Sequence, residues 1–408
     1  MNDRFILTIN AGSSSLKFAL FREDGEPARE MVGKFERIGL RGGKVTVTDV
    51  VANKRKERPC HVPNHLACVP LLADLLQRKG DMGTSRAIGH RIVHGGPRYC
   101  EPQPVDAALL TELRRMRSFD PDHLPAALGL VKDFRRRYPH APQVACFDTA
   151  FHRHMPRVAK LLPIPRRYEA RGVQRYGFHG LSYAYLMREL EQAAGATAAR
   201  GRVILAHLGN GASMAAVRDG QSIDTTMAFT PAAGLVMSAR SGDLDPGLVA
   251  YFVRNEGMTA RQFNDMVNTQ SGLLGVSETS PDVRDLLARE ERDPRAAEAL
   301  ALFCYQAKKW IGALSAALGG LDTLVFSGGI GENSVPLRAR ICQGLDYLGV
   351  ELNPTRNQAN APVISREGRP VTVRVIRTDE EWHVARIVCE LLADSAPRGS
   401  RQRKEARL

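Results

Sequence analysis

The sequence lacks the marks of membrane, disulfide-bonded and fibrous proteins. No stretch of its 408 residues approaches the roughly 18 consecutive apolar residues that a membrane helix needs. The seven cysteines form no C-x-x-C pair and their number is odd, which argues against a zinc knuckle or a disulfide framework. The first residues lead directly into an apolar run without the layout of a signal peptide. We therefore expect a cytoplasmic enzyme or binding protein.

Acidic residues are outnumbered, since 57 lysines and arginines against 44 aspartates and glutamates give a net charge of +13. Such a balance can suit nucleic acid, an anionic membrane or small anionic ligands. The basic clusters at residues 54–56, 135–137 and 396–408 are short and far apart. Aromatic residues make up only 6% of the chain and are not interleaved with these clusters, as a nucleic-acid stacking surface would require. We interpret the clusters as solvated surface and expect neither a nucleic-acid nor a membrane partner.

The hydrophobic pattern predicts an α/β protein with an internal duplication. Residues 5–9 and 16–21 form apolar strand-like runs on either side of a turn of small residues. Residues 203–208 and 214–217 repeat this arrangement around a second such turn. A shift of 198 residues places Ser15 on Ser213. Two similar halves would each present a hairpin whose turn exposes backbone N–H groups.

A third unit follows towards the C-terminus. Residues 300–318 read as a helix that ends at a glycine pair, and residues 321–326 as a buried strand. The glycine-rich segment 327–333 is then predicted to be a turn before a helix that starts at Ser334. Glycines at this position allow a ligand to approach the backbone, and the following helix favours anions. By itself the segment fits both a nucleotide site and an ordinary loop.

Several ionisable residues stand among small residues where strand-like runs end. Examples are Arg91 between glycines, Asp148 after an apolar run, and His179 between two glycines. Such residues suit a cleft better than a core. Zinc is the competing interpretation, with His90 and His94, or His152 and His154, as ligand pairs. Neither pair has an evident third ligand, so we do not favour it.

Seven segments together resemble the acetate kinase family, of the acetate and sugar kinase, Hsc70 and actin superfamily. They occur in order between residue 6 and about residue 386. The segments are NAGSSSLK (10–17), GHRIVHGG (89–96), FDTAFH (147–152), RYGFHG (175–180), HLGNGAS (207–213), GGIGENS (328–334) and TDEE (378–381). The resemblance implies a two-domain, duplicated ribonuclease H-like (actin-like ATPase) α/β fold.

The resemblance also implies a reaction: reversible transfer of the ATP γ-phosphoryl to acetate, which yields acetyl phosphate and ADP. A carboxylate is already ionised at neutral pH, so the site needs cations to hold two anions together rather than a strong base. By resemblance, Arg91 and Arg240 supply these cations, and His179 donates to the equatorial phosphoryl oxygens. Such families assign Asp148 to proton transfer, but orienting an arginine and the metal is more plausible, because the acceptor has no proton to lose.

The binding residues are likewise implied by the resemblance. Asn10 and Glu380 would hold Mg²⁺, which Mn²⁺ can replace, partly through waters. Val93, Phe178 and Pro231 would form the wall around the substrate methyl group. The contacts to ATP or ADP would come from Lys17, Ser13, His207, Leu208, Gly209, Asn210, Gly211, Asp282, Val283, Arg284, Gly329, Ile330, Gly331, Glu332 and Asn333.

Four departures from the family pattern bear on specificity. Asp122 stands where an apolar pocket residue is usual, with Leu124 nearby as a substitute, and a buried unpaired carboxylate would be costly. Residues 181–183 read LSY in place of Thr-Ser-His, so Tyr183 replaces a histidine. Val283 replaces an aromatic residue at the adenine site, and Asp379 replaces an asparagine beside Glu380. None of them removes a charged catalytic group.

We expect an N-terminal lobe of residues 1–150 plus 380–408, on the metal and substrate side, and a C-terminal lobe of residues 151–379, on the nucleotide side. The cleft between them would close on the substrates and exclude water. The family is typically homodimeric. One alternative is a propionate or butyrate kinase with the same mechanism. A more distant alternative is a nucleotide-dependent switch ATPase without an acyl acceptor, for which a second carboxylate-binding arginine would have no use.

Overall fold

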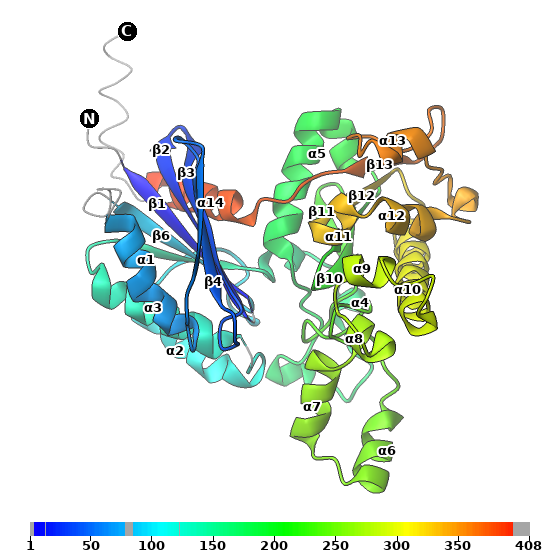
Figure 1. Ribbon diagram of the computed structural model, residues 1–408, viewed down its shortest axis with the longest axis horizontal. Helices are drawn as coiled ribbons and strands as arrows, with labels where there is room; N and C mark the ends of the chain where they lie inside the picture. The colour runs from blue at the N-terminus through cyan, green and yellow to red at the C-terminus, as the bar shows by residue number, and fades with distance from the viewer. Residues whose placement is uncertain (1–3, 13, 78–84, 122, 395–408) are drawn as a thin grey trace. The chain divides into compact units, whose positions relative to one another are not determined.

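The computed structural model describes residues 4–12, 14–77, 85–121 and 123–394. Ser13, Asp122 and the basic segment 396–408 therefore lie outside the described residues. The chain divides into two compact units (Figure 1). Unit 1 comprises Met1–Ala150 and Asp379–Leu408, and unit 2 comprises Phe151–Thr378.

Unit 1 is built on an eight-stranded sheet of order β5-β4-β3-β2-β1-β6-β8-β7. Strands β1 to β5 pair antiparallel with their chain neighbours, whereas β6 pairs parallel with both β1 and β8. The strands are β1 Phe5–Ala11, β2 Ser15–Asp24, β3 Glu26–Glu36, β4 Lys44–Asp49, β5 Lys54–Pro59, β6 Ser85–Ile92, β7 Gln103–Pro104 and β8 Gln143–Phe147.

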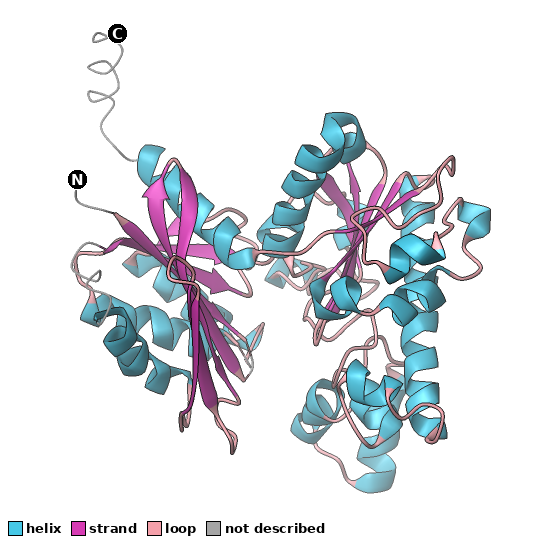
Figure 2. Ribbon diagram, turned by 45° about the horizontal axis from the view of Figure 1, so that its top comes forward, coloured by secondary structure: helices cyan, strands magenta, loops and turns pink. Residues whose placement is uncertain are grey.

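Helices lie on both faces of this sheet (Figure 2). The helices of unit 1 are α1 Cys68–Gln77, α2 Ala107–Arg115, α3 Leu124–Arg137 and α14 Glu380–Asp394. Alternation along β1 divides its side chains, because Leu7 and Ile9 join the core with α1 and α3 while Asn10 reaches the start of α14. Helix α14 lies so close to β6 that a Cβ at Gly89 would come within 2.5 Å of Val384. The family motifs at the strand ends thus meet the first turn of α14.

Unit 2 repeats the central arrangement of unit 1. Its sheet has the order β11-β10-β9-β12-β13, with the first three strands antiparallel and the last three parallel. The strands are β9 Val203–Leu208, β10 Ala212–Arg218, β11 Gln221–Thr225, β12 Thr323–Ser327 and β13 Thr372–Val375. Strands β3-β2-β1-β6-β8 of unit 1 follow the same order and directions. This repetition confirms the predicted duplicated α/β fold.

The helices of unit 2 show two differences from the expected elements. Helix α10 begins at Pro294, six residues before the expected start, because the Asp293 side chain caps it by accepting from Arg295 N–H at 3.0 Å. The glycine-rich segment is itself helical rather than a turn. The helices are α4 Arg157–Lys160, α5 Gly180–Arg200, α6 Gly247–Glu256, α7 Ala260–Thr269, α8 Gly272–Ser277, α9 Val283–Leu287, α10 Pro294–Leu318, α11 Gly328–Asn333, α12 Val335–Cys342 and α13 Pro354–Gln358.

Helix α5 packs on one face of this second sheet. Tyr183, Leu186 and Leu190 join one hydrophobic core with alternate residues of β9 and β10, such as Leu205 and Ala215. In the part of the chain that is described, no helix combines the length and the apolar character that crossing a bilayer requires.

Candidate active site

Arg91 and Asp148 form a buried ion pair at the edge of the unit 1 sheet. Arg91 lies in β6 and Asp148 directly follows β8, and the carboxyl ends of these parallel neighbours meet. Arg91 Nε donates to both oxygens of Asp148, at 3.0 and 3.1 Å, and Nη2 donates to Oδ2 at 2.6 Å. The side chain of Asp148 is 1% exposed and that of Arg91 15%. One side of the guanidinium is thereby fixed by the carboxylate.

Burial and charge have opposite effects on the pKa of each member of this pair. Burial alone would lower the pKa of Arg91, but the carboxylates of Asp148 and Glu380 outweigh it and raise that pKa. Burial raises the pKa of Asp148 against the opposing effect of Arg91. Arg91 therefore stays cationic, and Asp148 is occupied in holding it.

Asn10 connects this pair to the start of α14. Its Oδ1 accepts from Arg91 Nη1 at 3.0 Å, and its Nδ2 donates to Glu380 Oε2 at 2.8 Å and to Glu381 Oε1 at 3.0 Å. Lys17 lies opposite Asn10 on β2, with Nζ 3.9 Å from Glu381 Oε1. The charge of Glu381 raises the pKa of Lys17. Of the predicted residues, the structure thus brings Asn10, Lys17, Arg91, Asp148 and Glu380 together.

The oxygen atoms in this cluster fit the predicted metal. Asn10 and Glu380 carry an amide and a carboxylate oxygen, ligand types that suit Mg²⁺ with several waters. Here the amide oxygen of Asn10 accepts from Arg91, and its Nδ2 faces Glu380. The described residues contain no group of three or more His, Cys, Asp or Glu side chains placed to hold an ion, so the metal site stays a prediction.

Asp379, one of the departures from the family pattern, has a partner of its own. Arg29 Nη2 donates to both of its oxygens, at 2.5 and 2.6 Å. The same carboxylate accepts from Trp382 N–H at 2.9 Å and so caps α14. The additional negative charge beside Glu380 is therefore balanced within unit 1.

His179 is the central predicted residue of unit 2. It precedes α5 with φ +57°, a left-handed conformation that is uncommon outside glycine. Its Nδ1 is hydrogen-bonded to Ser213 Oγ at 2.8 Å, and its ring lies 4.5 Å from that of His207, centroid to centroid. His207 and Ser213 are paired across β9 and β10. The imidazole is therefore held against the second hairpin.

Arg240 and His179 converge on Gly211. A Cβ built at Gly211 would lie 3.3 Å from His179 Nε2 and 3.6 Å from Arg240 Nη1. Arg240 Nη1 donates to the carbonyl of Pro231 at 3.3 Å. The absence of a side chain at Gly211 leaves a space that two hydrogen-bond donors border.

The predicted nucleotide segments also meet in unit 2. Gly209 N–H donates to the carbonyl of Gly211 at 3.1 Å, which closes the turn after β9. A Cβ at Gly209 would lie 3.8 Å from the amide nitrogen of Gly329, so this turn adjoins α11. Gly328 has φ +75°, and a Cβ there would come within 2.6 Å of the Leu208 carbonyl. The turn after β9 and the start of α11 therefore lie next to each other. They include the predicted residues Leu208, Gly209, Asn210, Gly211, Gly329 and Ile330.

Glu332 and Asn333 have side-chain contacts that the sequence did not indicate. The carboxylate of Glu332 accepts from Gly328 N–H at 2.9 Å and from Thr378 N–H at 3.1 Å. Asn333 Nδ2 donates to the carbonyl of Gly329 at 2.9 Å. Both side chains therefore stabilise α11, and Glu332 also binds the segment that leads out of unit 2.

The remaining predicted residues, for the nucleotide and for the substrate methyl group, lie outside these clusters. Asp282 caps α9 and holds Arg284, whose Nη2 donates to it at 2.6 Å. Val283 is buried, whereas the side chain of Arg284 is 89% exposed. Of the predicted methyl wall, Val93 belongs to unit 1, and Phe178 and Pro231 belong to unit 2. Arg91 and Arg240 are divided in the same way, so their convergence stays a prediction.

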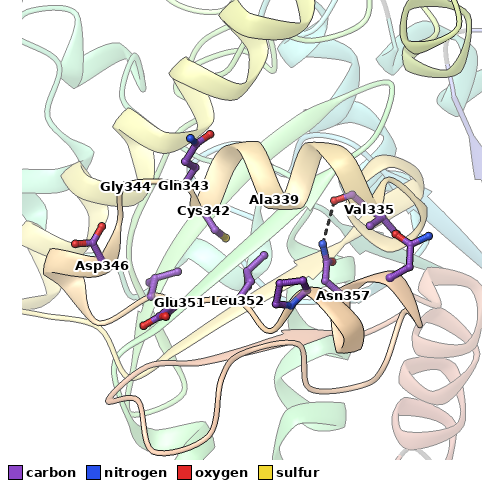
Figure 3. Close-up of a pocket in the computed structure, with 12 residues that line it drawn as sticks. Val335, Ala339, Cys342, Gln343, Gly344, Asp346, Glu351, Leu352 and Asn357 are labelled. Carbon is purple, nitrogen blue, oxygen red and sulfur yellow. Dashed lines mark hydrogen bonds between the residues drawn. The ribbon is translucent and has the colours of Figure 1, made fainter.

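A separate pocket of about 350 Å³ lies between α12 and α13, and no predicted site residue lines it (Figure 3). Asn357, in its lining, donates to the Val335 carbonyl and accepts from the fully buried Arg338 at 2.9 Å. Arg338 also donates to the carbonyls of Gly331 and Glu332, at 2.8 and 3.0 Å. Arg338 therefore connects Asn357, in the lining of this pocket, to the backbone of α11.

Sequence reasoning missed four residues of these clusters: Tyr183, Ser213, Glu381 and Arg338. Helical spacing could have indicated Tyr183, which stands four residues after His179. The others depend on contacts between distant segments.

Two units whose five central strands share one order, each carrying polar groups where its parallel strands end, are typical of the two-domain actin-like ATPase fold. Comparison with known proteins agrees. The model of the acetokinase family matches residues 5–386. An acetate kinase of Rhodopseudomonas palustris is 41% identical over 391 residues, covering 95% of this chain and 98% of the relative. A propionate kinase of Citrobacter rodentium is 40% identical over 399 residues, covering 96% and 98%.

Solved structures show the same relationship. The crystal structure of Porphyromonas gingivalis acetate kinase superposes with a TM-score of 0.86 at 32% identity, covering 95% of this chain and 100% of the other. The chain belongs to the acetokinase family, whose members are phosphotransferases with a carboxylate acceptor.

Proposed function

We propose that this enzyme transfers the γ-phosphoryl group of ATP reversibly to acetate, giving acetyl phosphate and ADP. The observation that carries the proposal is the joined cluster of Arg91, Asp148, Asn10 and Glu380, which supplies a guanidinium for an anion beside oxygen ligands for a metal. Family membership supports ATP as donor and a small carboxylate as acceptor.

In this proposal, Arg91 binds the carboxylate of the acceptor. Its Nε is held by Asp148, and its Nη1 donates to Asn10. The acceptor is already ionised, so no group has to remove a proton from it. Asp148 therefore serves to orient Arg91, which its three contacts with the guanidinium support.

His179 and Arg240 act on the transferring phosphoryl group. Both border the space at Gly211, next to the turns proposed to hold the nucleotide. Two donors that are already in place stabilise the charge of the transition state without reorganisation. Lys17 and Ser13 complete the phosphate contacts in this proposal, and Asp282, Val283 and Arg284 those to the rest of the nucleotide.

Asn10 and Glu380 would hold Mg²⁺, or Mn²⁺ in its place, with waters as the remaining ligands. When bound, the ion neutralises charge on the nucleotide phosphates. Glu381 and Lys17 adjoin these ligands and would keep them in position.

The acceptor could also be propionate, a proposal that the named relatives support, because propionate kinases stand beside acetate kinases at similar identity. We propose acetate as the better acceptor. Steady-state kinetics with acetate, propionate and butyrate test this choice, and a kcat/KM for propionate well above that for acetate would reverse it.

Trapping with hydroxylamine tests the reaction itself. With ATP, Mg²⁺ and acetate present, we expect acetyl hydroxamate to accumulate in proportion to ADP. Formation of ADP without hydroxamate would instead indicate a nucleotide-driven switch.

We further propose that the enzyme works as a homodimer in the cytoplasm, where its substrate ATP is available.

A further inference from the structure

We propose that Tyr183 and Ser213 are positioning residues that hold the imidazole of His179 in the tautomer with its proton on Nε2. The role of that proton towards a phosphoryl group depends on the proposed function. The tautomer itself does not depend on the proposed function, and it can be measured on the protein without substrates.

The three side chains form a continuous hydrogen-bonded row. His179 precedes α5 and Tyr183 lies one turn further on, so both reach the same face of the sheet. Ser213 Oγ is 2.8 Å from His179 Nδ1 and is hydrogen-bonded to the hydroxyl of Tyr183. Tyr183 and Ser213 are both fully buried. The hydrogen bond between Tyr183 and Ser213 is therefore shielded from water, while His179 is only partly buried.

Counting hydrogens fixes the direction of the row. Ser213 Oγ is the one hydrogen-bond partner of the Tyr183 hydroxyl among the described residues, and the phenol is completely buried. A buried hydroxyl that did not donate would leave its hydrogen unsatisfied, at a cost of about 1–3 kcal/mol. Tyr183 therefore donates to Ser213. Ser213 Oγ could also accept from an Nδ1–H, but its own buried hydrogen would then lack an acceptor among the described residues, at a similar cost. The Ser213 hydroxyl therefore donates to Nδ1 of His179, which is unprotonated, and the imidazole proton lies on Nε2.

Burial makes the tyrosine a dependable donor. The rings of Phe151 and His152 pack against Tyr183, with centroids at 5.8 and 5.7 Å. Burial raises the pKa of Tyr183, so the hydroxyl keeps its proton throughout the neutral range. The family pattern has a histidine here, a side chain that can also accept a proton. In this chain Tyr183 acts as the donor, so the hydrogen bonds run in one direction, from Tyr183 through Ser213 to His179.

The Nε2 proton faces the proposed reaction space. A Cβ at Gly211 would lie 3.3 Å from Nε2 and 3.6 Å from Arg240 Nη1. The ring of His207 lies beside that of His179, tilted by 35°. The titratable or charged groups that the described contacts place near His179 include His207, Arg240 and Tyr183. A neutral imidazole with Nε2–H can still donate to a phosphoryl oxygen.

Nitrogen NMR of the protein labelled in its histidine rings tests the proposal. His179→Gln assigns the signals. In the wild type we expect Nδ1 to show the shift of an unprotonated nitrogen and Nε2 that of a protonated one at pH 7.5. A wild-type spectrum with the proton on Nδ1 overturns the proposal directly, whatever the variants do.

Tyr183→Phe keeps the ring and removes the donor. Ser213 then loses the hydrogen bond that polarises its hydroxyl towards Nδ1, so the preference for a proton on Nε2 weakens. We expect Nδ1–H signal to increase, His179 to gain its second proton at higher pH, and kcat to fall on the order of 10-fold with the KM values within about twofold. Tyr347→Phe, at a tyrosine that is 72% exposed, is the control and should match the wild type.

A Tyr183→Phe spectrum identical to that of the wild type would contradict the proposal. If the variant does not fold, Ser213→Thr, which retains the hydroxyl, should keep the wild-type tautomer, whereas Ser213→Ala should lose it. The expected spectra without acyl phosphate formation would leave the tautomer established and reject the proposed function instead.

Discussion

Arg91 shows how much a single side chain depends on its immediate contacts. The sequence does not show in which direction this side chain points. In the structure, Nε of Arg91 donates to Asp148 and Nη1 donates to Asn10, and these two bonds fix the orientation of the guanidinium. Sequence resemblance indicated Arg91, Asp148 and Asn10 individually. Their mutual hydrogen bonds come from three strand ends that only folding places together.

Asp148→Asn tests the orienting role. The amide keeps one acceptor but loses the negative charge, so Arg91 is held less firmly. We expect kcat/KM for acetate to fall on the order of 100-fold with little change in KM for ATP, since misplacing a binding group has an effect of this size. Steady-state kinetics measure it. Asp133→Asn, at an exposed pair with Arg136, is the matched control, and equal losses in both variants would reject the orienting role.

Buried histidines predict a loss of stability in acid. Burial lowers the pKa of His90 and of His152 to about 4, below the usual value near 6.5. The unfolded chain therefore binds more protons than the folded one between these values, so stability falls as the pH decreases from about 6.5 towards 4. The difference amounts to about 3 kcal/mol for each residue when complete.

Chemical denaturation at pH 7.5, 6 and 5 measures this loss. His90→Gln removes one of two buried histidines of unit 1 whose pKa is lowered to about 4, the other being His94, and should make the stability less dependent on pH than in the wild type. An unfolding free energy that stays constant from pH 7.5 to 5 would show that these histidines titrate normally in the folded protein.

At the scale of elements, the hairpin turn between β9 and β10 and the short helix α11 lie side by side in the candidate site of unit 2. The glycine segment was predicted to be a turn but forms α11, because Glu332 accepts from the N–H of Gly328 and Asn333 donates back to Gly329. Local sequence shows glycines but not these returning side chains. The strand-turn-strand unit that contains Gly211 was expected and is present as β9 and β10, whereas the role of Gly211 in nucleotide binding stays a prediction.

Gly211→Ala tests the space bordered by His179 and Arg240. The added methyl would lie 3.3 Å from His179 Nε2, which is close enough to displace the imidazole. We expect kcat/KM for ATP to fall on the order of 10-fold or more while the melting temperature changes little. Gly312→Ala in α10, where the Cβ meets only Tyr347 at 3.5 Å, is the control. Unchanged kinetics in Gly211→Ala would place the reaction elsewhere.

At the scale of the whole molecule, helix α6 exposes several apolar side chains. Neither α6 nor α7 buries a single residue, and α6 exposes Val249, Tyr251 and Val253 by 39, 56 and 46%. Val249 and Val253 share one face of the helix, and Tyr251 lies on another. Apolar side chains exposed in this way often mark a contact with another protein. This helix is therefore the surface we propose for the homodimer.

Tyr251→Lys tests the contact by placing a charge in it. We expect the molar mass measured by light scattering to change from that of a dimer to that of a monomer at micromolar concentration. Tyr305→Lys, at a tyrosine in α10 that is 60% exposed, should leave the dimer intact. A monomeric wild type, or a variant that stays dimeric, would exclude α6 as the interface.

The sequence by itself determined the class of fold and the family, because both depend on local patterns: strand-turn-strand units, glycine segments and seven motifs in order. Only tertiary structure decided which side chains share a proton or an ion pair. Asn10 and Glu380 are separated by 370 residues, and Tyr183 and Ser213 by 30, yet each pair is hydrogen-bonded. Hydrogen bonds require contact, and contacts across such distances arise only when strands pair and helices pack on them.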